Sequence, residues 1–424
     1  MLQIAQIQEN KEAVISGLKT RNFKEPEKAI DSVLEFDAQR KSIQQKQDKA
    51  LAEANQLSKQ IGQLMMQGKK EEAELIKEQT AKYKAESKIL GEELKIVTEE
   101  LQQILFTIPN IPNPIVPKGN SDEDNKVLST HGAIPVLYKG AKPHWDLIEQ
   151  YDIIDFELGN KITGAGFPVY KGKGAKLQRA LVNFFLDEAD KAGYNEVQPP
   201  ILINQASGYG TGQLPDKEGQ MYHATEDDYY LIPTAEVPIT NMYRDVILKE
   251  DELPKKHVGF TPCFRREAGS WGAHVRGLNR LHQFDKVEIV QVQHPDKSYA
   301  ALDEMSTYIQ TLLRKLELPY RVLLLCGGDL GFTSAITYDM EVFSAAQQKW
   351  LEVSSVSNFE TFQANRLKLR YKDEDKKTQL LHTLNGSALA LPRIVAAILE
   401  NNQTEEGIKI PKVLVPYCKF EWIN

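Results

Sequence analysis

The sequence is poor in cysteine and has no long apolar run. Its three cysteines, Cys263, Cys326 and Cys418, lie far apart and are odd in number, which excludes a disulfide scaffold or a cysteine-based zinc knuckle and fits a reducing compartment. Apolar runs such as Val322–Cys326 are far shorter than the roughly 20 residues that span a bilayer. Residues 1–10 lack the pattern of a signal peptide. We therefore expect a cytoplasmic protein without membrane contact.

Common catalytic and nucleotide-binding signatures are also missing. There is no G-x-x-x-x-G-K-[ST] phosphate loop, and neither Gly164–Gly166 nor Gly172–Gly174 completes G-x-G-x-x-G. H-E-x-x-H and G-x-S-x-G are absent, and the eight histidines show no metal-binding spacing. A site for ATP would therefore have to be built from arginines and metal-binding carboxylates.

The charge balance is slightly acidic. The chain has 424 residues, with 52 Lys and Arg against 59 Asp and Glu and a net charge of -7. This balance argues against a uniformly basic nucleic-acid-binding protein, although a local basic patch remains compatible with it. The length predicts two or three domains.

Proline is missing from residues 27–108 and then clusters at Pro109, Pro112, Pro114 and Pro117. Because proline inside a helix costs about 3 kcal/mol, this stretch, rich in Glu, Lys, Gln, Ala and Leu, predicts long helices. Only Gly62, Gly68 and Gly91 interrupt it. The cluster predicts a boundary, with one domain at 1–110 and a second at 111–424.

Two apolar seams with alternating spacings of four and three predict a coiled coil in residues 29–64 and 73–104. Between them, Met66–Lys70 shifts the register and supplies a glycine, which predicts the tip of an antiparallel helical hairpin. Two separate bundle helices, or a parallel dimeric coiled coil, are the alternatives. The seam positions are Ala29, Val33, Phe36, Arg40, Ile43, Gln47, Ala50, Ala54, Leu57, Ile61 and Leu64, then Ala73, Ile76, Thr80, Tyr83, Ser87, Leu90, Leu94, Val97, Leu101 and Ile104.

Residues 111–424 alternate short β-rich runs with helical runs, which predicts an α+β domain with a largely antiparallel sheet flanked by helices. The expected strands are Tyr229–Ile232, Lys256–Thr261, Lys286–Val292, Tyr320–Leu325 and Ile336–Val342, and the expected helices are Ala175–Ala192, Ser298–Leu316 and Leu389–Glu400.

The most informative segment is Phe260–Gln291, which predicts a strand, a glycine-containing loop and a second strand. Its loop region holds four arginines against one acid, Glu267. Guanidinium groups bind carboxylates and phosphates with paired hydrogen bonds, so an anion site is favoured over a surface hairpin. The arginines are Arg265, Arg266, Arg276 and Arg280.

Three further segments carry polar residues in distinctive settings. Leu231–Pro238 places Thr234 and Glu236 in a loop bracketed by prolines. Leu351–Asn358 offers Glu352 and Ser355 as ligands of a hard cation. In Thr383–Arg393 we expect a polar turn, formed by Asn385, Gly386 and Ser387, before an apolar helix that carries Arg393.

Taken together, these segments resemble the seryl-tRNA synthetases of the class II aminoacyl-tRNA synthetase family, over essentially the whole chain. The family's second motif matches Phe264–Glu267 with Gly277–Glu288, and its third motif matches Asn385–Arg393. Its first motif, a long helix and a strand ending in proline, matches Ala175–Pro200, and its TAE loop matches Thr234–Glu236. The helical arm is itself typical of this specificity.

The resemblance implies a homodimer with a class II fold, whose first-motif helix lies at the dimer interface. It implies a serine–tRNA ligase that uses ATP and Mg²⁺. L-Serine would be activated to seryl-adenylate with release of pyrophosphate, and then transferred to the 3′ end of serine tRNA, with selenocysteine tRNA left open as a second substrate. The alternatives are a class II paralogue that charges a carrier protein, and a non-catalytic RNA-binding coiled-coil protein.

The resemblance also implies roles for individual residues. Arg265 would bridge the α-phosphate and the serine carboxylate, and Glu267 and Arg393 would complete the catalytic set. Adenine would stack between Phe284 and Arg393. The implied ATP-binding residues are Arg265, Arg266, Glu267, Phe284, Glu352, Val353, Ser354, Ser355 and Arg393, with Glu352 and Ser355 as metal ligands; the implied serine-binding residues are Thr234, Ala235, Glu236, Arg265, Glu288, Asn385 and Ser387.

The arm would bind the long variable arm of the serine tRNA through phosphate contacts. Its candidates are Arg40, Lys46, Lys49, Lys59, Lys69 and Lys70.

Elsewhere the sequence departs from the family pattern. The second-motif loop has Trp271, Ala273, His274 and Val275 where Tyr, Arg, Asp and Thr are common, Arg266 replaces a Ser, and Leu391-Pro392 replaces Val-Gly before Arg393.

Overall fold

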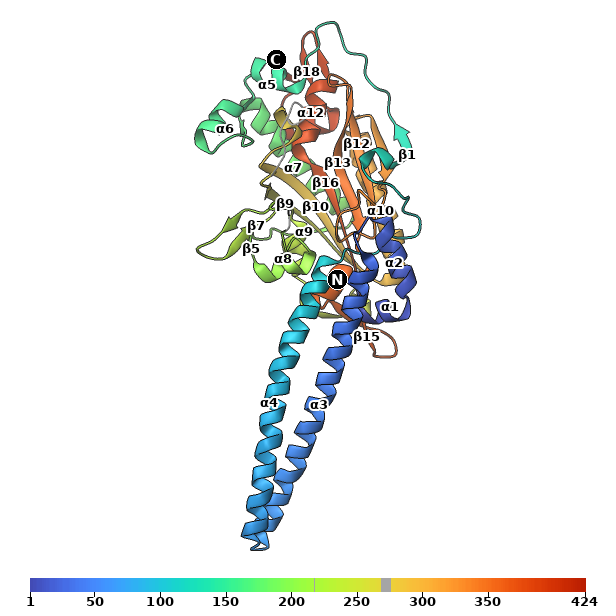
Figure 1. Cartoon of the computed structure of the whole chain (residues 1–424). Coiled ribbons are helices and arrows are strands. Elements are labelled where there is room, and N and C mark those ends of the chain that lie inside the picture. The colour runs from blue at the N-terminus through green and yellow to red at the C-terminus, as the bar shows by residue number, and fades with distance from the viewer. Residues whose placement is uncertain (217, 268–275) are drawn as a thin grey trace. The chain divides into compact units, whose positions relative to one another are not determined.

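The computed structural model describes residues 1–216, 218–267 and 276–424. Trp271, Ala273, His274 and Val275 of the second-motif loop lie outside the described residues. The chain forms two compact units, one made of Met1–Lys19 and Phe23–Pro109 and the other of Thr20–Asn22 and Asn110–Asn424 (Figure 1). No helix among the described residues combines the length and apolarity needed to cross a membrane.

Two long antiparallel helices form most of the first unit, which confirms the predicted hairpin. They are α3 (Pro26–Met66, 41 residues) and α4 (Lys70–Thr107, 38 residues). Residues 67–69 join them, and Gly68 has a φ of +77°, which a residue without a Cβ adopts readily. Gly62 and Gly91 lie within the helices and do not interrupt them. Two short helices, α1 (Ile4–Glu9) and α2 (Lys11–Thr20), precede the hairpin.

The predicted seams form the contact between α3 and α4, because every seam position is buried or half-buried. Gln47 Nε2 donates to the Ser87 carbonyl at 3.3 Å, which fixes the level at which the helices face each other. A Cβ on Gly91 would lie 2.7 Å from Gln47 Nε2, so the helices approach closely there. Small residues such as Ala50 and Ala54 sustain this packing along the arm.

The second unit is built on an eight-stranded sheet with the order β1-β11-β12-β13-β16-β10-β9-β4. Neighbouring strands are antiparallel except for β4 and β9, as the α+β prediction requires. The strands are β1 (Lys126–His131), β4 (Asn195–Glu196), β9 (Lys255–Phe264), β10 (Gln283–Gln293), β11 (Tyr320–Leu324), β12 (Ile336–Ser344), β13 (Lys349–Asn358) and β16 (His382–Ala390).

Three helices cover this sheet and form its main core. Helix α10 (Ser298–Lys315) packs on β13 and β16, α7 (Gly172–Lys191) packs on β9 and β10, and α12 (Leu391–Asn401) packs on β10, β12 and β13. The shorter helices are α5 (His144–Gln150), α6 (Phe156–Ile162), α8 (Gln205–Thr211), α9 (Glu236–Asn241), α11 (Thr361–Leu367) and α13 (Val415–Cys418).

Small sheets and single-turn helices complete the unit. Predicted strand Tyr229–Ile232 becomes β7 (Tyr229–Leu231), which pairs outside the large sheet. The other small strands are β2 (Ile154–Asp155), β3 (Val169–Tyr170), β5 (Leu202–Asn204), β6 (His223–Ala224), β8 (Ile247–Lys249), β14 (Arg370–Lys372), β15 (Thr378–Leu380), β17 (Gln403–Thr404), β18 (Gly407–Lys409) and β19 (Trp422–Ile423), and the described 3-10 turns are η1 (Asp122–Asp124), η2 (Glu250–Glu252), η4 (Gly277–Asn279), η5 (Pro295–Lys297) and η6 (Lys412–Leu414).

The expected polar turn at Asn385–Ser387 is wrong, because these residues lie within β16. Pairing with both neighbours holds them extended: Asn385 lies opposite Val290 and Ser387 opposite Glu288 in β10, while Gly386 lies opposite Val356 in β13. The polar residues therefore belong to one face of the central sheet. The following helix begins at Leu391 instead of Leu389.

Two other local predictions need correction. Glu236 is the first residue of α9 and not part of a loop, whereas Thr234 lies just before that helix. The first-motif strand is only Asn195–Glu196 and ends before the two prolines, Pro199 and Pro200. Because proline offers no N–H to a neighbouring strand, pairing ends before them.

Candidate active site

The central strands present their polar side chains on one face of the sheet. A Cβ on Gly386 would lie 3.4 Å from Met305 in α10, so Gly386 faces that helix. Side chains alternate along a strand, and its neighbours Asn385 and Ser387 therefore face the opposite side. Glu288 lies directly opposite Ser387 and shares this face. The candidate site is built on the face of the sheet away from α10.

A pair of buried carboxylates forms the inner part of the site. Asn385 Nδ2 donates to Glu236 Oε2 at 2.8 Å and to Glu288 Oε1 at 3.2 Å. Ser387 Oγ donates to Glu288 Oε2 at 3.3 Å. Thr234 Oγ1 accepts from the Glu236 backbone N–H at 3.3 Å. The structure thus brings these predicted serine-binding residues into one connected group, with Ala235 fully buried beside them.

The two carboxylates have different electrostatic settings. Glu288 lies 2.7 Å from the buried ammonium group of Lys286, which compensates its charge. Burial raises the pKa of Glu236 to about 7; the hydrogen bond from Gln363 opposes this shift and the charge of Glu288 adds to it. At neutral pH the pocket therefore holds a carboxyl group that a bound cation would readily ionise.

The sequence reasoning missed two members of this pocket. Lys286 was part of the matched second-motif stretch but had no role assigned, although a lysine inside an otherwise buried strand is an unusual feature. Gln363 in α11 donates to Glu236 Oε1 at 2.6 Å and accepts from Thr383 Oγ1 at 2.7 Å. No local sequence signal marks Gln363, because only the tertiary fold brings α11 to this position.

A cavity adjoins the pocket and is lined by most of the predicted ATP-binding residues. The Arg265 guanidinium lies 5.2 Å from the centre of the Phe284 ring. Glu267 forms an ion pair with Arg280. The lining residues are Arg265, Glu267, Leu278, Asn279, Arg280, Leu281, Phe284, Lys286, Glu352, Val353, Ser354, Ser387, Ala390, Pro392 and Arg393. Ser387 and Lys286 line both the cavity and the inner pocket, so the two are continuous.

Arg393 is held in the first turn of α12 by backbone carbonyls on two sides. Its Nε donates to the Asn279 carbonyl at 3.1 Å, and its Nη1 donates to the Glu352 carbonyl at 2.7 Å. Pro392 at the helix start fixes its own φ near the helical value, which favours this turn. The guanidinium is therefore positioned before any ligand binds.

A β-bulge brings the two predicted metal ligands to one face of β13. Asp339 pairs with Ser355, and Glu341 pairs with Glu352, with the register shifted between them. Asp339 and Glu341 are two residues apart and share a face, so their cross-strand partners Ser355 and Glu352 share it too. Without the bulge, residues three apart would point to opposite faces.

The oxygen atoms around this bulge fit a hard cation. Ser355 Oγ donates to Asp339 Oδ1 at 2.5 Å, which leaves the hydroxyl lone pairs free. The Glu352 carboxylate is half-exposed, 3.6 Å from Arg393. Burial, with the charge of Glu352, raises the pKa of Asp339 well above its usual value. No cluster of three metal-binding side chains occurs among the described residues.

Other predicted site residues lie at the margin. Arg266 is exposed and is not among the residues that line the cavity, and its backbone N–H donates to the Gln220 carbonyl at 2.8 Å. Ser355 is not among the residues that line the cavity. On the arm, Arg40 contacts Asp37 at 2.8 Å and Lys69 contacts Glu72 at 3.4 Å.

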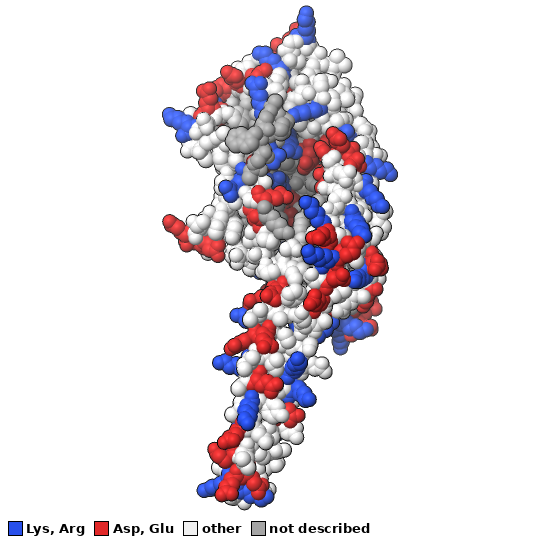
Figure 2. Space-filling view, in the orientation of Figure 1, with Lys and Arg blue, Asp and Glu red and all other residues white. Residues whose placement is uncertain are grey.

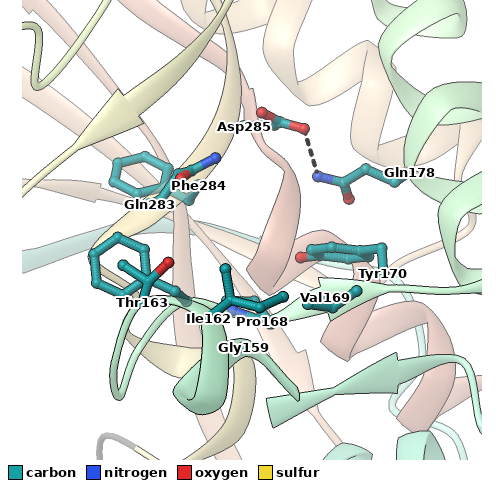
Figure 3. Close-up of a pocket in the computed structure, with 11 residues that line it drawn as sticks. Gly159, Ile162, Thr163, Pro168, Val169, Tyr170, Gln178, Gln283, Phe284 and Asp285 are labelled. Atoms are coloured by element: carbon teal, nitrogen blue, oxygen red, sulfur yellow. Dashed lines mark hydrogen bonds between the residues drawn. The ribbon is translucent and has the colours of Figure 1, made fainter. Parts of the chain in front are cut away.

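A second cavity shares Phe284 with the first. Gln178 of α7 donates to Asp285 at 3.0 Å, with the Tyr170 ring beneath them (Figure 3). Ile162, Pro168 and Val169 form the lower wall in that view. Burial raises the pKa of Asp285, and the described residues that line this cavity include no arginine, unlike those of the first cavity.

Comparisons with known proteins agree with this geometry. Residues 1–112 match the family model described as the seryl-tRNA synthetase N-terminal domain, and residues 220–402 match the class II tRNA synthetase core domain for G, H, P, S and T. A serine–tRNA ligase from Salinibacter ruber is 49% identical over 100% of this chain and 99% of its own length. One from Chlorobium luteolum is 45% identical with the same coverage.

Solved structures show the same similarity. A seryl-tRNA synthetase from Pyrococcus horikoshii, complexed with ATP, is 33% identical and superposes with a TM-score of 0.92 over 100% of this chain and 99% of that chain. A cytoplasmic serine–tRNA ligase from Naegleria fowleri, in complex with AMP, is 26% identical with a TM-score of 0.87 and the same coverage.

Proposed function

The chain belongs to the seryl-tRNA synthetase family and is a serine–tRNA ligase that binds ATP, and we propose how its residues divide the work. The observation that carries the proposal is the junction between the two parts of the site. A pocket with the buried carboxyl groups of Glu236 and Glu288 opens into a cavity lined by Arg265 and Arg393. One end can hold a small amino acid and the other a polyphosphate.

In the activation step, a serine carboxylate oxygen attacks the α-phosphorus of ATP, and the bond to the leaving pyrophosphate breaks. The substrate supplies the nucleophile, so the protein's part is to align the reactants and neutralise charge. Arg265 is proposed to bind both the serine carboxylate and the α-phosphate. To do so it leaves the Phe284 ring, which then stacks on adenine opposite Arg393.

Serine specificity follows from the polar inner pocket. We assign the ammonium group to Glu236, whose charge Lys286 does not directly compensate, and the hydroxyl to Glu288 and Ser387. Alanine has no hydroxyl to hydrogen-bond with Glu288 and Ser387, so it would lose these contacts in a buried site that is built to bind a hydroxyl. Asn385 holds the two carboxyl groups in place, and Thr234 holds the backbone N–H of Glu236.

Mg²⁺ is proposed to bind at Glu352 and Ser355, with phosphate oxygens completing its shell. The half-exposed carboxylate and the serine hydroxyl suit this ion, which commonly takes few protein ligands. When bound, Mg²⁺ would neutralise phosphate charge. Asp339 accepts a hydrogen bond from the Ser355 hydroxyl. This contact turns the lone pairs of the hydroxyl oxygen outward.

The second step transfers the seryl group from the adenylate to a hydroxyl of the terminal adenosine of serine tRNA, releasing AMP. The arm is proposed to hold the tRNA through its phosphates. Among the described residues, no acid is paired with Lys46, Lys49, Lys59 or Lys70, so these are better candidates than Arg40 or Lys69. Lys and Arg alternate with Asp and Glu along the visible face of the arm (Figure 2).

A homodimer that works in the cytoplasm completes the proposal. Helices α6 and α7 both pack on β3, and Leu158 and Ile162 of α6 are 39% and 69% exposed. An exposed apolar pair beside the first-motif helix suits an interface with a second copy. Light scattering on the wild type and on Ile162→Glu would test it, because the charge should shift a dimer toward monomer.

Pyrophosphate exchange into ATP, measured with each amino acid in turn, tests the activity. We expect exchange that depends on serine, and its absence would contradict the function. Arg265→Ala should lower exchange by about a hundredfold or more, because an anion-binding group is lost. Since Arg265 is exposed, the thermal unfolding of the variant should stay close to that of the wild type. Full exchange activity in the variant would contradict the role of Arg265.

A further inference from the structure

A network of buried polar groups lies behind the wall of the ATP cavity. His144, the first residue of α5, and Glu400 in α12 are fully buried. His144 Nδ1 lies 2.6 Å from Glu400 Oε1, and the His144 backbone N–H donates to the same oxygen at 2.9 Å. Ser344 at the end of β12 donates to Glu400 Oε2. These contacts join three elements around one carboxylate.

Hydrogen-bond donors surround the Glu400 carboxylate within this network. Burial by itself would raise the pKa of Glu400, but the hydrogen bonds from His144 and Ser344 outweigh it and hold the pKa below its usual value. Gln347 adds another donor, with its Nε2 2.8 Å from Glu400 Oε1. A buried carboxylate with this many donors is rigidly oriented.

The other ring nitrogen of His144 holds the cavity wall. The Leu278 backbone N–H donates to His144 Nε2 at 2.8 Å. Nε2 must therefore be unprotonated, so the ring carries its proton on Nδ1 and donates it to Glu400. Leu278 belongs to η4 (Gly277–Asn279), and both Leu278 and Asn279 line the cavity.

The η4 turn lies so close to the imidazole that its first residue has no room for a side chain. Gly277 has a φ of +67°, and a Cβ there would lie 2.3 Å from His144 Nε2. Only glycine allows both this backbone conformation and this approach. The position of η4 is thus set by the His144 ring.

A second branch of the network reaches the arginine of the third motif. Gln347 Oε1 accepts from Asn279 Nδ2 at 3.0 Å, and the Asn279 carbonyl accepts from Arg393 Nε at 3.1 Å. Glu400 and Arg393 also belong to the same helix, α12. The carboxylate therefore reaches the guanidinium through Gln347 and Asn279 as well as through the helix itself.

We propose that the buried His144–Glu400 pair is a positioning device for the ATP site, which holds η4 and, through Gln347 and Asn279, the guanidinium of Arg393. Neither residue touches substrate. Their effect falls on the adenine end of the cavity, whereas the serine pocket at Glu236 and Glu288 has its own supports. This inference rests on the proposed function, because it assigns the η4 wall to ATP.

The test uses His144→Asn, which keeps a donor near Glu400 but is too short to accept from Leu278, and Gln347→Ala, which cuts the second branch at a half-buried position. We expect the KM for ATP in pyrophosphate exchange to rise roughly tenfold or more in His144→Asn and less in Gln347→Ala. The KM for serine should stay within about twofold. Calorimetric titration with ATP alone should show the same loss.

A matched control is His382→Asn, because His382 is also buried and hydrogen-bonded, with its Nδ1 2.7 Å from Ser298 Oγ. It should leave both KM values unchanged even if it lowers stability. Unchanged ATP affinity in folded His144→Asn, or equal shifts for ATP and serine, would overturn the inference. If His144→Asn does not fold, Gln347→Ala decides by the same criterion. A wild type without serine-dependent exchange would instead refute the function itself.

Discussion

The arm and the catalytic sheet use charged side chains in opposite ways. On the arm, ion pairs such as Lys77–Glu74 have side chains that are 47% and 68% exposed. In the sheet, the Lys286–Glu288 pair is 7% and 1% exposed. Exposed pairs contribute little to stability and are screened by salt, whereas a buried charge is costly unless its partners are in place. Charge on the arm therefore remains accessible to a charged ligand and contributes little to stability, whereas the effect of the charges in the sheet depends on the geometry of their contacts.

The largest effect should come from Glu288→Ala, which leaves Lys286 buried without its partner. We expect the free energy of unfolding to fall by about 3–5 kcal/mol, and serine-dependent exchange to fall by at least about a thousandfold. Urea unfolding and pyrophosphate exchange would measure these. The matched control is Glu304→Ala, which removes the exposed partner of Lys256 and should cost less than about 1 kcal/mol. Equal losses in both variants would break the comparison.

Shortening the arm should separate the two reaction steps. Gln47 faces Ser87 across the hairpin, so the cut ends of α3 and α4 lie side by side when residues 45–91 are removed. A short Gly-Ser link can then join them. We expect tRNA charging at low tRNA concentration to fall by about a hundredfold, because many phosphate contacts are lost, with serine-dependent exchange unchanged. Normal charging by the shortened enzyme would remove the arm from tRNA binding.

The pH dependence of serine binding should report the buried state of Glu236. Because its pKa is raised to about 7, the carboxyl is mostly protonated at pH 6 and mostly ionised at pH 8. If it binds the serine ammonium group, the KM for serine should fall by about tenfold over this interval. Glu236→Gln should bind serine weakly with a flat profile.

The same shift has the opposite sign for stability. A carboxyl with a raised folded-state pKa favours the folded state below its unfolded pKa, and this contribution is lost as the pH rises toward 7. In the wild type, the unfolding free energy should therefore decrease between roughly pH 4.5 and pH 7 because of Glu236. This decrease should be absent in Glu236→Gln. A wild-type serine KM that does not change with pH would contradict the ammonium assignment.

The smallest effect is expected from arm lysines. Replacing both Lys46 and Lys49 with Ala should raise the KM for tRNA a fewfold. The slope of the logarithm of the binding constant against the logarithm of the salt concentration should become less steep by about 0.7–0.9 for each lost phosphate contact. Stability should change by less than about 0.5 kcal/mol. Lys77→Ala, whose charge is already paired on α4, is the control. Equal effects on tRNA binding from the paired and unpaired lysines would show that pairing with an acid does not decide which arm lysines contribute.

The two regions also differ in how far the sequence predicted them. The arm followed from a missing residue type and a seven-residue period, both local properties, and its helices begin and end near the predicted tip. In the sheet, the motif match predicted one site for Phe284, Glu288 and Arg393, and Phe284 and Arg393 line the same cavity. It misjudged Asn385–Ser387, because a polar Asn-Gly-Ser run has the local preference of a turn and only pairing with β10 and β13 makes it a strand.

The sequence by itself determined the helical arm, the α+β class and the motif residues that identify a serine–tRNA ligase, since periodicity, proline placement and motif spacing are properties of neighbouring residues. Only the tertiary structure decided which residues support that site. Gln363 reaches Glu236 across 127 positions, and His144 reaches Glu400 across 256. Burial in a shared interior creates such contacts, and it also gives Glu236 its raised pKa, so neither can be read from a local pattern.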